Sequence, residues 1–126
     1  MSNAQKIVMI VEDEPDAAEL FAEMMRLNGF RVIKTYSSTP ALGLIMQEKP
    51  DLILLDIMMP EISGLDILRS MRSNPDLALI PVVVVSARAT PTDIKNGLDA
   101  GASIYLTKPV SYMDLKNAVD GLLQGK

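Results

Sequence analysis

Residues 51–60 read DLILLDIMMP, and this stretch decides the fold. Leu52 to Leu55 form an apolar run without polar interruption, and the run leads directly to Asp56. Such a run of strand length is typical of a strand buried on both faces, as in a parallel sheet. An aspartate at the carboxyl end of that strand lies where open α/β sheets bind ligands. We therefore interpret Asp56 as the reactive residue of the chain.

Outward from this stretch, the chain alternates strand-like and helix-like segments. Strands are predicted at residues 6–11, 31–36, 52–56, 81–86 and 103–107, and each is followed by apolar residues at helical spacing. Five consecutive β-α units predict an α/β fold with a parallel sheet and five helices covering both sides. The first, third and fourth strands carry the continuous apolar runs and are expected in the centre. This favours the flavodoxin-like, doubly wound order 2-1-3-4-5.

The helix boundaries are predicted from prolines and capping residues. Pro15, Pro40 and Pro91 each suit the first helical position, and the last two follow Thr39 and Thr90, which are typical N-cap residues. The apolar residues expected to anchor the first and fourth helices are Ala17, Leu20, Phe21, Met24 and Leu27, and Ile94 and Leu98, respectively.

The chain has 126 residues, enough for one domain with a single core. We expect this domain to span residues 6–124, with residues 1–5 disordered or left over from an expression vector. The net charge of −4 argues against direct binding of nucleic acid. No apolar run approaches the roughly 18 residues of a membrane span, and no signal peptide is apparent. A soluble protein in the cytoplasm is therefore expected.

The sequence contains neither cysteine nor histidine. Their absence excludes disulfides, thiolate catalysis and nucleophiles activated by histidine. Carboxylates are the strong metal ligands that remain, so a metal site in this chain should hold a hard cation such as Mg²⁺.

Acidic residues follow two strands that are expected to be neighbours. Glu12 and Asp13 end the first strand, and Asp56 ends the third. Any one of them alone is more simply explained as a loop or helix-cap residue. Three carboxylates meeting at the switch point of the sheet would raise one another's pKa unless a cation intervenes. Together they therefore indicate a metal site.

Ser86 and Lys108 end the fourth and fifth strands at the same edge of the sheet. Lys108 is either a solvated loop charge or a cation that reaches over the acidic residues. Three acids and one lysine sum to −2, the charge that a bound Mg²⁺ would balance. Ser86 either caps the following helix or donates a hydrogen bond to an anion held on Asp56.

Together these features resemble the receiver domain of response regulators, the phospho-acceptor module of two-component signalling. The resemblance covers residues 6–123. It rests on five motifs in the expected order: the Glu12-Asp13 pair, DIMMPEISG at residues 56–64, SAR at residues 86–88, GA at residues 101–102 and KP at residues 108–109.

The resemblance implies how the acidic site would work. Asp56 would accept a phosphoryl group from a phosphohistidine of a sensor histidine kinase or a histidine phosphotransfer protein. Asp13 and Asp56 would bind Mg²⁺, with Mn²⁺ as a substitute, while Glu12 would help through a bound water. The backbone carbonyl of Met58 would supply a further contact to the metal. Lys108 would pair with the phosphoryl group.

The resemblance also implies how the state of the site is reported. Ser86 would move to contact the phosphoryl group, and Tyr105 would change its rotamer in response, although Tyr105 is equally well explained as a half-packed aromatic of an edge strand. Met58 and Arg88 would influence the lifetime of the phosphoryl group. The bond before Pro109 is expected to be cis. The output would pass to a downstream effector protein or domain, or to a phosphorylation-dependent homodimer.

Three other functions are less consistent with the sequence. A small phosphatase with an aspartate nucleophile would need a second acid two residues after Asp56, where the chain has Met58. A nucleotide- or flavin-binding module would need a glycine-rich phosphate loop, and no G-x-G-x-x-G pattern occurs. A phosphorylation-independent binding scaffold would be expected to have lost part of the acidic site, which is complete here.

Overall fold

The computed structural model describes residues 6–124 and contains a five-stranded parallel sheet. The strands are β1 (Ile7–Val11), β2 (Arg31–Thr35), β3 (Leu52–Leu55), β4 (Val82–Ser86) and β5 (Ile104–Thr107). Their order in the sheet is β2-β1-β3-β4-β5, which confirms the predicted flavodoxin-like order. The expectation for residues 1–5 lies outside the described residues.

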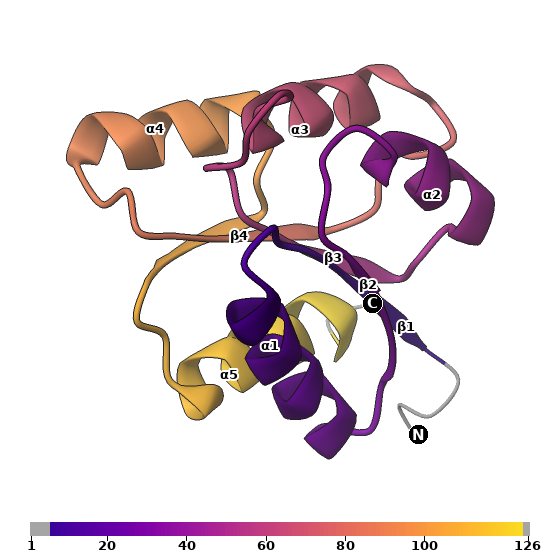
Figure 1. Cartoon of the computed structure of the whole chain (residues 1–126), viewed down its shortest axis with the longest axis vertical. Coiled ribbons are helices and arrows are strands. Elements are labelled where there is room, and N and C mark those ends of the chain that lie inside the picture. The colour runs from indigo at the N-terminus through magenta and orange to yellow at the C-terminus, as the bar shows by residue number, and fades with distance from the viewer. Residues whose placement is uncertain (1–5, 125–126) are drawn as a thin grey trace.

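Five helices cover the two faces of this sheet. They are α1 (Pro15–Leu27), α2 (Ala41–Glu48), α3 (Gly64–Ser73), α4 (Pro91–Ala100) and α5 (Tyr112–Gln124). Figure 1 shows α1 and α5 together on one side of the strands and α2, α3 and α4 on the other. Each side has its own apolar cluster, one centred on Met9 and Ile53 and the other on Ile10 and Leu54.

Burial along the strands follows the apolar runs. Every residue of β3 and β4 is buried, and so is every residue of β1 after Ile7. The edge strands β2 and β5 are only partly buried. Because central strands are packed on both faces and edge strands are not, the continuity of each apolar run correctly predicted its place in the sheet.

The predicted start of α2 is wrong, whereas α1 and α4 begin as predicted at Pro15 and Pro91. Thr39 does not cap α2, because Pro40 occupies the N-cap position and no side chain bonds to the helix there. The hydroxyl of Thr39 instead donates to Glu61, 2.6 Å away in the loop after β3. A tertiary contact has therefore replaced the local cap.

The predicted core faces of α1 and α4 are partly wrong. In α1, Leu20 and Leu27 are 54% and 75% exposed. The residues of α1 that are buried are Ala18, Phe21, Ala22 and Met25. In α4, Leu98 is exposed, while Gly97 and Ala100 are buried. The buried face of α4 is made of small residues, which let the helix backbone approach the strands closely, while that of α1 combines two alanines with Phe21 and Met25.

No helix within residues 6–124 is both long enough and apolar enough to cross a membrane.

Candidate functional site

The pairing of β1 with β3 places two carboxylates side by side. Val11 is the register partner of Leu55, and Glu12 and Asp56 are the residues that follow them. The backbone N–H of Asp56 donates to the carbonyl of Val11 at 3.0 Å, which extends the pairing by one step. The two acidic side chains therefore leave neighbouring strands at the same edge.

Asp13 completes an acidic cluster with these two residues. Glu12, Asp13 and Asp56 each offer a carboxylate oxygen, and the three oxygens lie within 4.8 Å of one another. Glu12 is only 2% exposed and Asp56 only 7%, while Asp13 is half-buried. The cluster is the one predicted from the strand ends.

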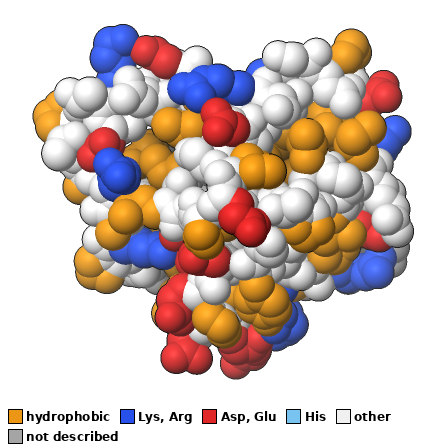
Figure 2. Space-filling view, turned by 45° about the horizontal axis from the view of Figure 1, so that its top comes forward, with side chains coloured by type: hydrophobic (Ala, Val, Ile, Leu, Met, Phe, Trp, Pro, Cys, Tyr) orange, Lys and Arg blue, Asp and Glu red, His pale blue; other side chains and the backbone are white. Residues whose placement is uncertain are grey.

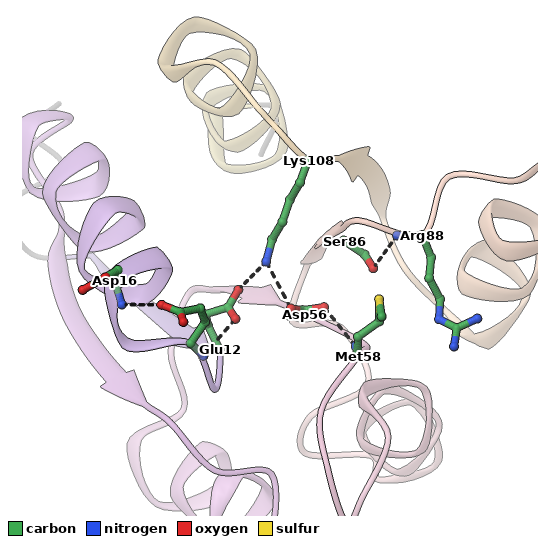
Figure 3. A network of polar contacts seen from close by, with 8 residues as sticks. Glu12, Asp16, Asp56, Met58, Ser86, Arg88 and Lys108 are labelled. Carbon is green, nitrogen blue, oxygen red and sulfur yellow. Dashed lines mark hydrogen bonds and ion pairs between the residues drawn. The ribbon is translucent and has the colours of Figure 1, made fainter.

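Lys108 reaches the cluster from the end of the edge strand β5. Its backbone N–H donates to the carbonyl of Ser86 at 2.9 Å, which fixes the chain just after β5. Its Nζ lies 2.8 Å from Oε1 of Glu12 and 3.1 Å from Oδ2 of Asp56, and Figure 3 shows the side chain reaching between them. The peptide bond from Lys108 to Pro109 is cis.

The electrostatics of the cluster reflect burial and incomplete charge balance. Burial raises the pKa of Glu12, and its hydrogen bond from Lys108 only partly opposes this. Burial would lower the pKa of Lys108, but its hydrogen bond to Glu12 and the charge of Asp56 outweigh that effect and raise it. Lys108 contacts two of the three carboxylates, so the cluster keeps a net negative charge. The donors are all oxygen atoms, which suits a hard divalent cation such as Mg²⁺.

The second oxygen of each buried carboxylate is held by the backbone. Oδ1 of Asp56 accepts from the N–H of Met58 at 2.9 Å, and Oε2 of Glu12 accepts from the N–H of Glu14 at 3.1 Å. The Met58 side chain is exposed. These contacts orient both carboxylates before any ligand binds.

Ser86 and Tyr105 meet at the backbone of Arg88. The buried hydroxyl of Ser86 accepts from the N–H of Arg88 at 3.2 Å, and the Tyr105 hydroxyl donates to the Arg88 carbonyl at 2.8 Å. Burial raises the pKa of Tyr105. The Arg88 side chain turns to Asp93, 3.7 Å away. Ser86 thus holds the loop before α4 but does not cap the helix, because the N-cap of α4 is Thr90.

Sequence reasoning missed a group of contacts beside the site. The hydroxyl of Ser38, only 3% exposed, bonds to the backbone at Pro60 and Ile62 in the loop after β3. Thr39 contacts Glu61 in the same loop. No local pattern distinguishes Ser38, because its partners lie 22 and 24 residues away.

The molecular surface carries both signs of charge. On the face shown in Figure 2, lysine and arginine side chains are scattered among acidic and apolar ones and form no continuous basic area.

Comparison with known proteins identifies the class. A model of the response regulator receiver domain family matches residues 8–120, so the chain belongs to that family. Receiver domains are signalling domains of two-component systems rather than catalytic enzymes, and phosphorylation and Mg²⁺ binding are typical of them. A search of curated protein sequences found no match.

Solved structures agree with this assignment. The signal receiver domain of a signal transduction histidine kinase from Syntrophus aciditrophicus is 32% identical, with a TM-score of 0.88 over 95% of this chain and 91% of that one. The receiver domain of the Francisella response regulator 1452 is 28% identical, with a TM-score of 0.88 over 96% and 98% of the two chains.

Proposed function

We propose that Asp56 accepts a phosphoryl group and that this chain is a phosphorylation-dependent switch of a two-component phosphorelay. The observation that carries the proposal is the contact of Lys108 with both Glu12 and Asp56 at the edge of the acidic cluster. A carboxylate nucleophile, a positively charged hydrogen-bond donor and a set of oxygen ligands therefore lie together at one edge of the sheet. Phosphoryl transfer asks a protein chiefly for such positioning and charge stabilisation.

In the proposed reaction, a carboxylate oxygen of Asp56 attacks the phosphorus of a phosphohistidine. The phosphorus–nitrogen bond breaks, its electron pair stays on the imidazole nitrogen, and an acyl phosphate forms on Asp56. Lys108 would offset charge on the transferred oxygens. The N–H of Met58, which donates to Oδ1, would hold the carboxylate in its orientation.

The carboxylates of Glu12, Asp13 and Asp56 and the backbone carbonyl of Met58 would hold Mg²⁺ or Mn²⁺. When bound, the ion would offset negative charge on the phosphoryl oxygens. The buried cluster with one lysine for three acids supports this assignment, because the residual negative charge favours a divalent cation.

The phosphoryl donor must come from another protein or domain with a histidine, because this chain has none. We infer a sensor histidine kinase or a histidine phosphotransfer protein as that partner, acting in the cytoplasm. The receiver fold itself implies partners of this kind but no particular one.

The output would run from Ser86 to Tyr105 and on to the surface made by α4, β5 and α5. Ser86 and Tyr105 both bond to the backbone of Arg88, so a movement of Ser86 towards the phosphoryl group would release its contact with the Arg88 N–H and loosen this loop. The altered surface would then bind an effector or a second copy of the chain. Met58 and Arg88 lie two residues after Asp56 and Ser86, respectively, and would influence the lifetime of the acyl phosphate.

Intact-mass spectrometry after incubation with acetyl phosphate tests the proposal. We expect a gain of one phosphoryl group that requires Mg²⁺, is lost on treatment with base and is absent from Asp56→Asn. Asp51→Asn is the matched control, because Asp51 is an exposed aspartate at the opposite end of β3. No gain by the folded wild-type chain would overturn the proposal.

The mass measurement and a phosphatase assay together separate the alternatives. A binding scaffold that acts without phosphorylation would gain no mass under any condition. A phosphatase with an aspartate nucleophile would instead release inorganic phosphate over many turnovers from p-nitrophenyl phosphate.

A further inference from the structure

The loop from residue 57 to residue 63 connects β3 to α3 and carries the backbone of Met58 beside Asp56. At its base the loop is closed by two contacts to the carbonyl of Ile57, from the N–H of Gly64 at 3.2 Å and from the hydroxyl of Ser63 at 3.4 Å. The backbone at the tip of the loop finds its partners elsewhere in the fold.

One flank of this loop is open. A groove of about 500 Å³ lies between the loop and the start of α4, lined by Met58, Met59, Arg88 and Asn96 among others. The side chain of Met58 is exposed. Met59, which lines this groove, is buried in the apolar cluster, whereas Pro60, Glu61 and Ile62 at the tip of the loop are exposed, so packing does little to hold the tip in place.

The other flank is held by Ser38, in the connection between β2 and α2. Its hydroxyl donates to the carbonyl of Pro60 at 2.9 Å and accepts from the N–H of Ile62 at 3.2 Å. Between these two residues, Glu61 has a left-handed backbone with φ of 69°. A left-handed conformation is strained for a residue with a side chain, so it persists only where the surroundings impose it.

We infer that Ser38 is a positioning residue for the phosphoryl-acceptor site, an inference that rests on the proposed function. By bonding on both sides of Glu61, a single buried hydroxyl fixes the tip of the loop and with it the Met58 backbone beside Asp56. Thr39 supports the same tip from the surface through Glu61, 2.6 Å away. Ser38 itself does not touch the acidic cluster and acts through the loop.

Outer partners of metal ligands typically change metal affinity by about 10–100-fold when they are removed, and an effect transmitted through a backbone segment falls at the lower end. For Ser38→Ala we therefore expect about a tenfold rise in the Mg²⁺ concentration that gives half-maximal phosphorylation by acetyl phosphate. The rate at saturating Mg²⁺ should stay close to that of the wild type. Ser37→Ala is the matched control, because Ser37 is the adjacent serine and is exposed.

Isothermal titration with Mg²⁺ alone gives a readout that does not depend on phosphorylation. Ser38→Ala should bind Mg²⁺ about tenfold more weakly there too, at a temperature where circular dichroism shows it to be folded. Thr39→Ala, which loosens the tip from outside, should shift affinity in the same direction by a smaller factor and serves as the test variant if Ser38→Ala does not fold.

The outcomes separate this inference from the function on which it rests. A Ser38→Ala chain that is less stable but binds Mg²⁺ like Ser37→Ala would overturn the inference, because Ser38 would then serve the fold alone. A wild-type chain that binds Mg²⁺ but is never phosphorylated would overturn the proposed function, and the titration would still decide the role of Ser38.

Discussion

The Nζ atom of Lys108 lies 3.1 Å from Oδ2 of Asp56, although 52 residues separate the two in sequence. The lysine is the one cation that contacts the buried carboxylates among residues 6–124. Its removal would leave two buried, negatively charged side chains next to each other without a compensating cation.

We expect Lys108→Met to be less stable than the wild type in the absence of divalent cations. Removing one partner of a buried ion pair typically costs 3–5 kcal/mol, and we expect about 1–2 kcal/mol here because the lysine side chain is 25% exposed. Mg²⁺ should restore most of the loss by taking over the charge balance. Urea denaturation with and without Mg²⁺ measures this, and Lys95→Met on exposed α4 is the control. A loss that Mg²⁺ does not reduce would contradict the prediction.

Mg²⁺ should stabilise the protein more as the pH rises. The pKa of Glu12 is raised in the folded state, so without metal its contribution to stability is full below the ordinary glutamate pKa of about 4.3 and is lost as the pH rises through the folded value. Mg²⁺ requires the deprotonated carboxylate and competes with that proton. The rise in Tm caused by Mg²⁺ should therefore be larger at neutral pH than near the ordinary glutamate pKa.

Differential scanning fluorimetry across this pH range gives the measurement. In Glu12→Gln the pH dependence of the Mg²⁺ effect should be weaker, because the titrating group is gone. A Mg²⁺ effect that is the same at every pH would show that Glu12 does not take part.

Arg72 should contribute strongly to stability although it forms no ion pair with a carboxylate within residues 6–124. Its guanidinium donates to the carbonyls of Gly101, Ala78 and Ile80 at 3.0, 3.0 and 2.7 Å, and so connects α3 to the end of α4 and the start of β4. Burial lowers its pKa.

We expect Arg72→Met to lower the free energy of unfolding by about 2–4 kcal/mol, because three carbonyls lose a charged donor. Arg69→Met is the matched control on the same helix. The ion pair of Arg69 with Asp66 is exposed, so the change should stay within about 0.5 kcal/mol. Equal effects of the two substitutions in urea denaturation would refute the role of Arg72.

Gly97 should be required for the packing of α4 against Tyr105. A Cβ atom added at Gly97 would lie 2.6 Å from Cδ2 of the Tyr105 ring, closer than real contacts allow. Gly97→Ala must therefore displace the ring or the helix, and we expect a loss of about 1–3 kcal/mol, as for other overpacked sites.

Gly43→Ala in α2 is the control, since an added Cβ there meets nothing within 4 Å and alanine favours the helix by about 0.5–1 kcal/mol. Urea denaturation and the near-ultraviolet circular dichroism of tyrosine report the two effects. A stable Gly97→Ala chain with an unchanged tyrosine signal would contradict the prediction.

The strand order and the edge that carries the site could be predicted from sequence, because both depend on local pattern. A continuous apolar run such as Leu52–Leu55 is typical of a strand buried on both faces, and the residues that end parallel strands lie at one edge of the sheet. This reasoning placed Glu12 and Asp56 together and left Lys108 as either a solvated loop charge or a cation above them, and in the structure Lys108 lies within hydrogen-bonding distance of both acids.

The tertiary structure decided which face of each helix is buried and where the loops are held. Leu20 and Leu98 are apolar yet exposed, whereas Ala18 and Gly97 are buried on the faces that their helices turn to the sheet. Thr39 resembles an N-cap but bonds to Glu61, since a partner distant in sequence competes with the local one. The sequence by itself therefore determined the topology and the acidic edge, through short-range periodicity. The space between a helix and the sheet, and contacts between residues 22 or more positions apart, exist only in the folded chain. These determined the packing around the site.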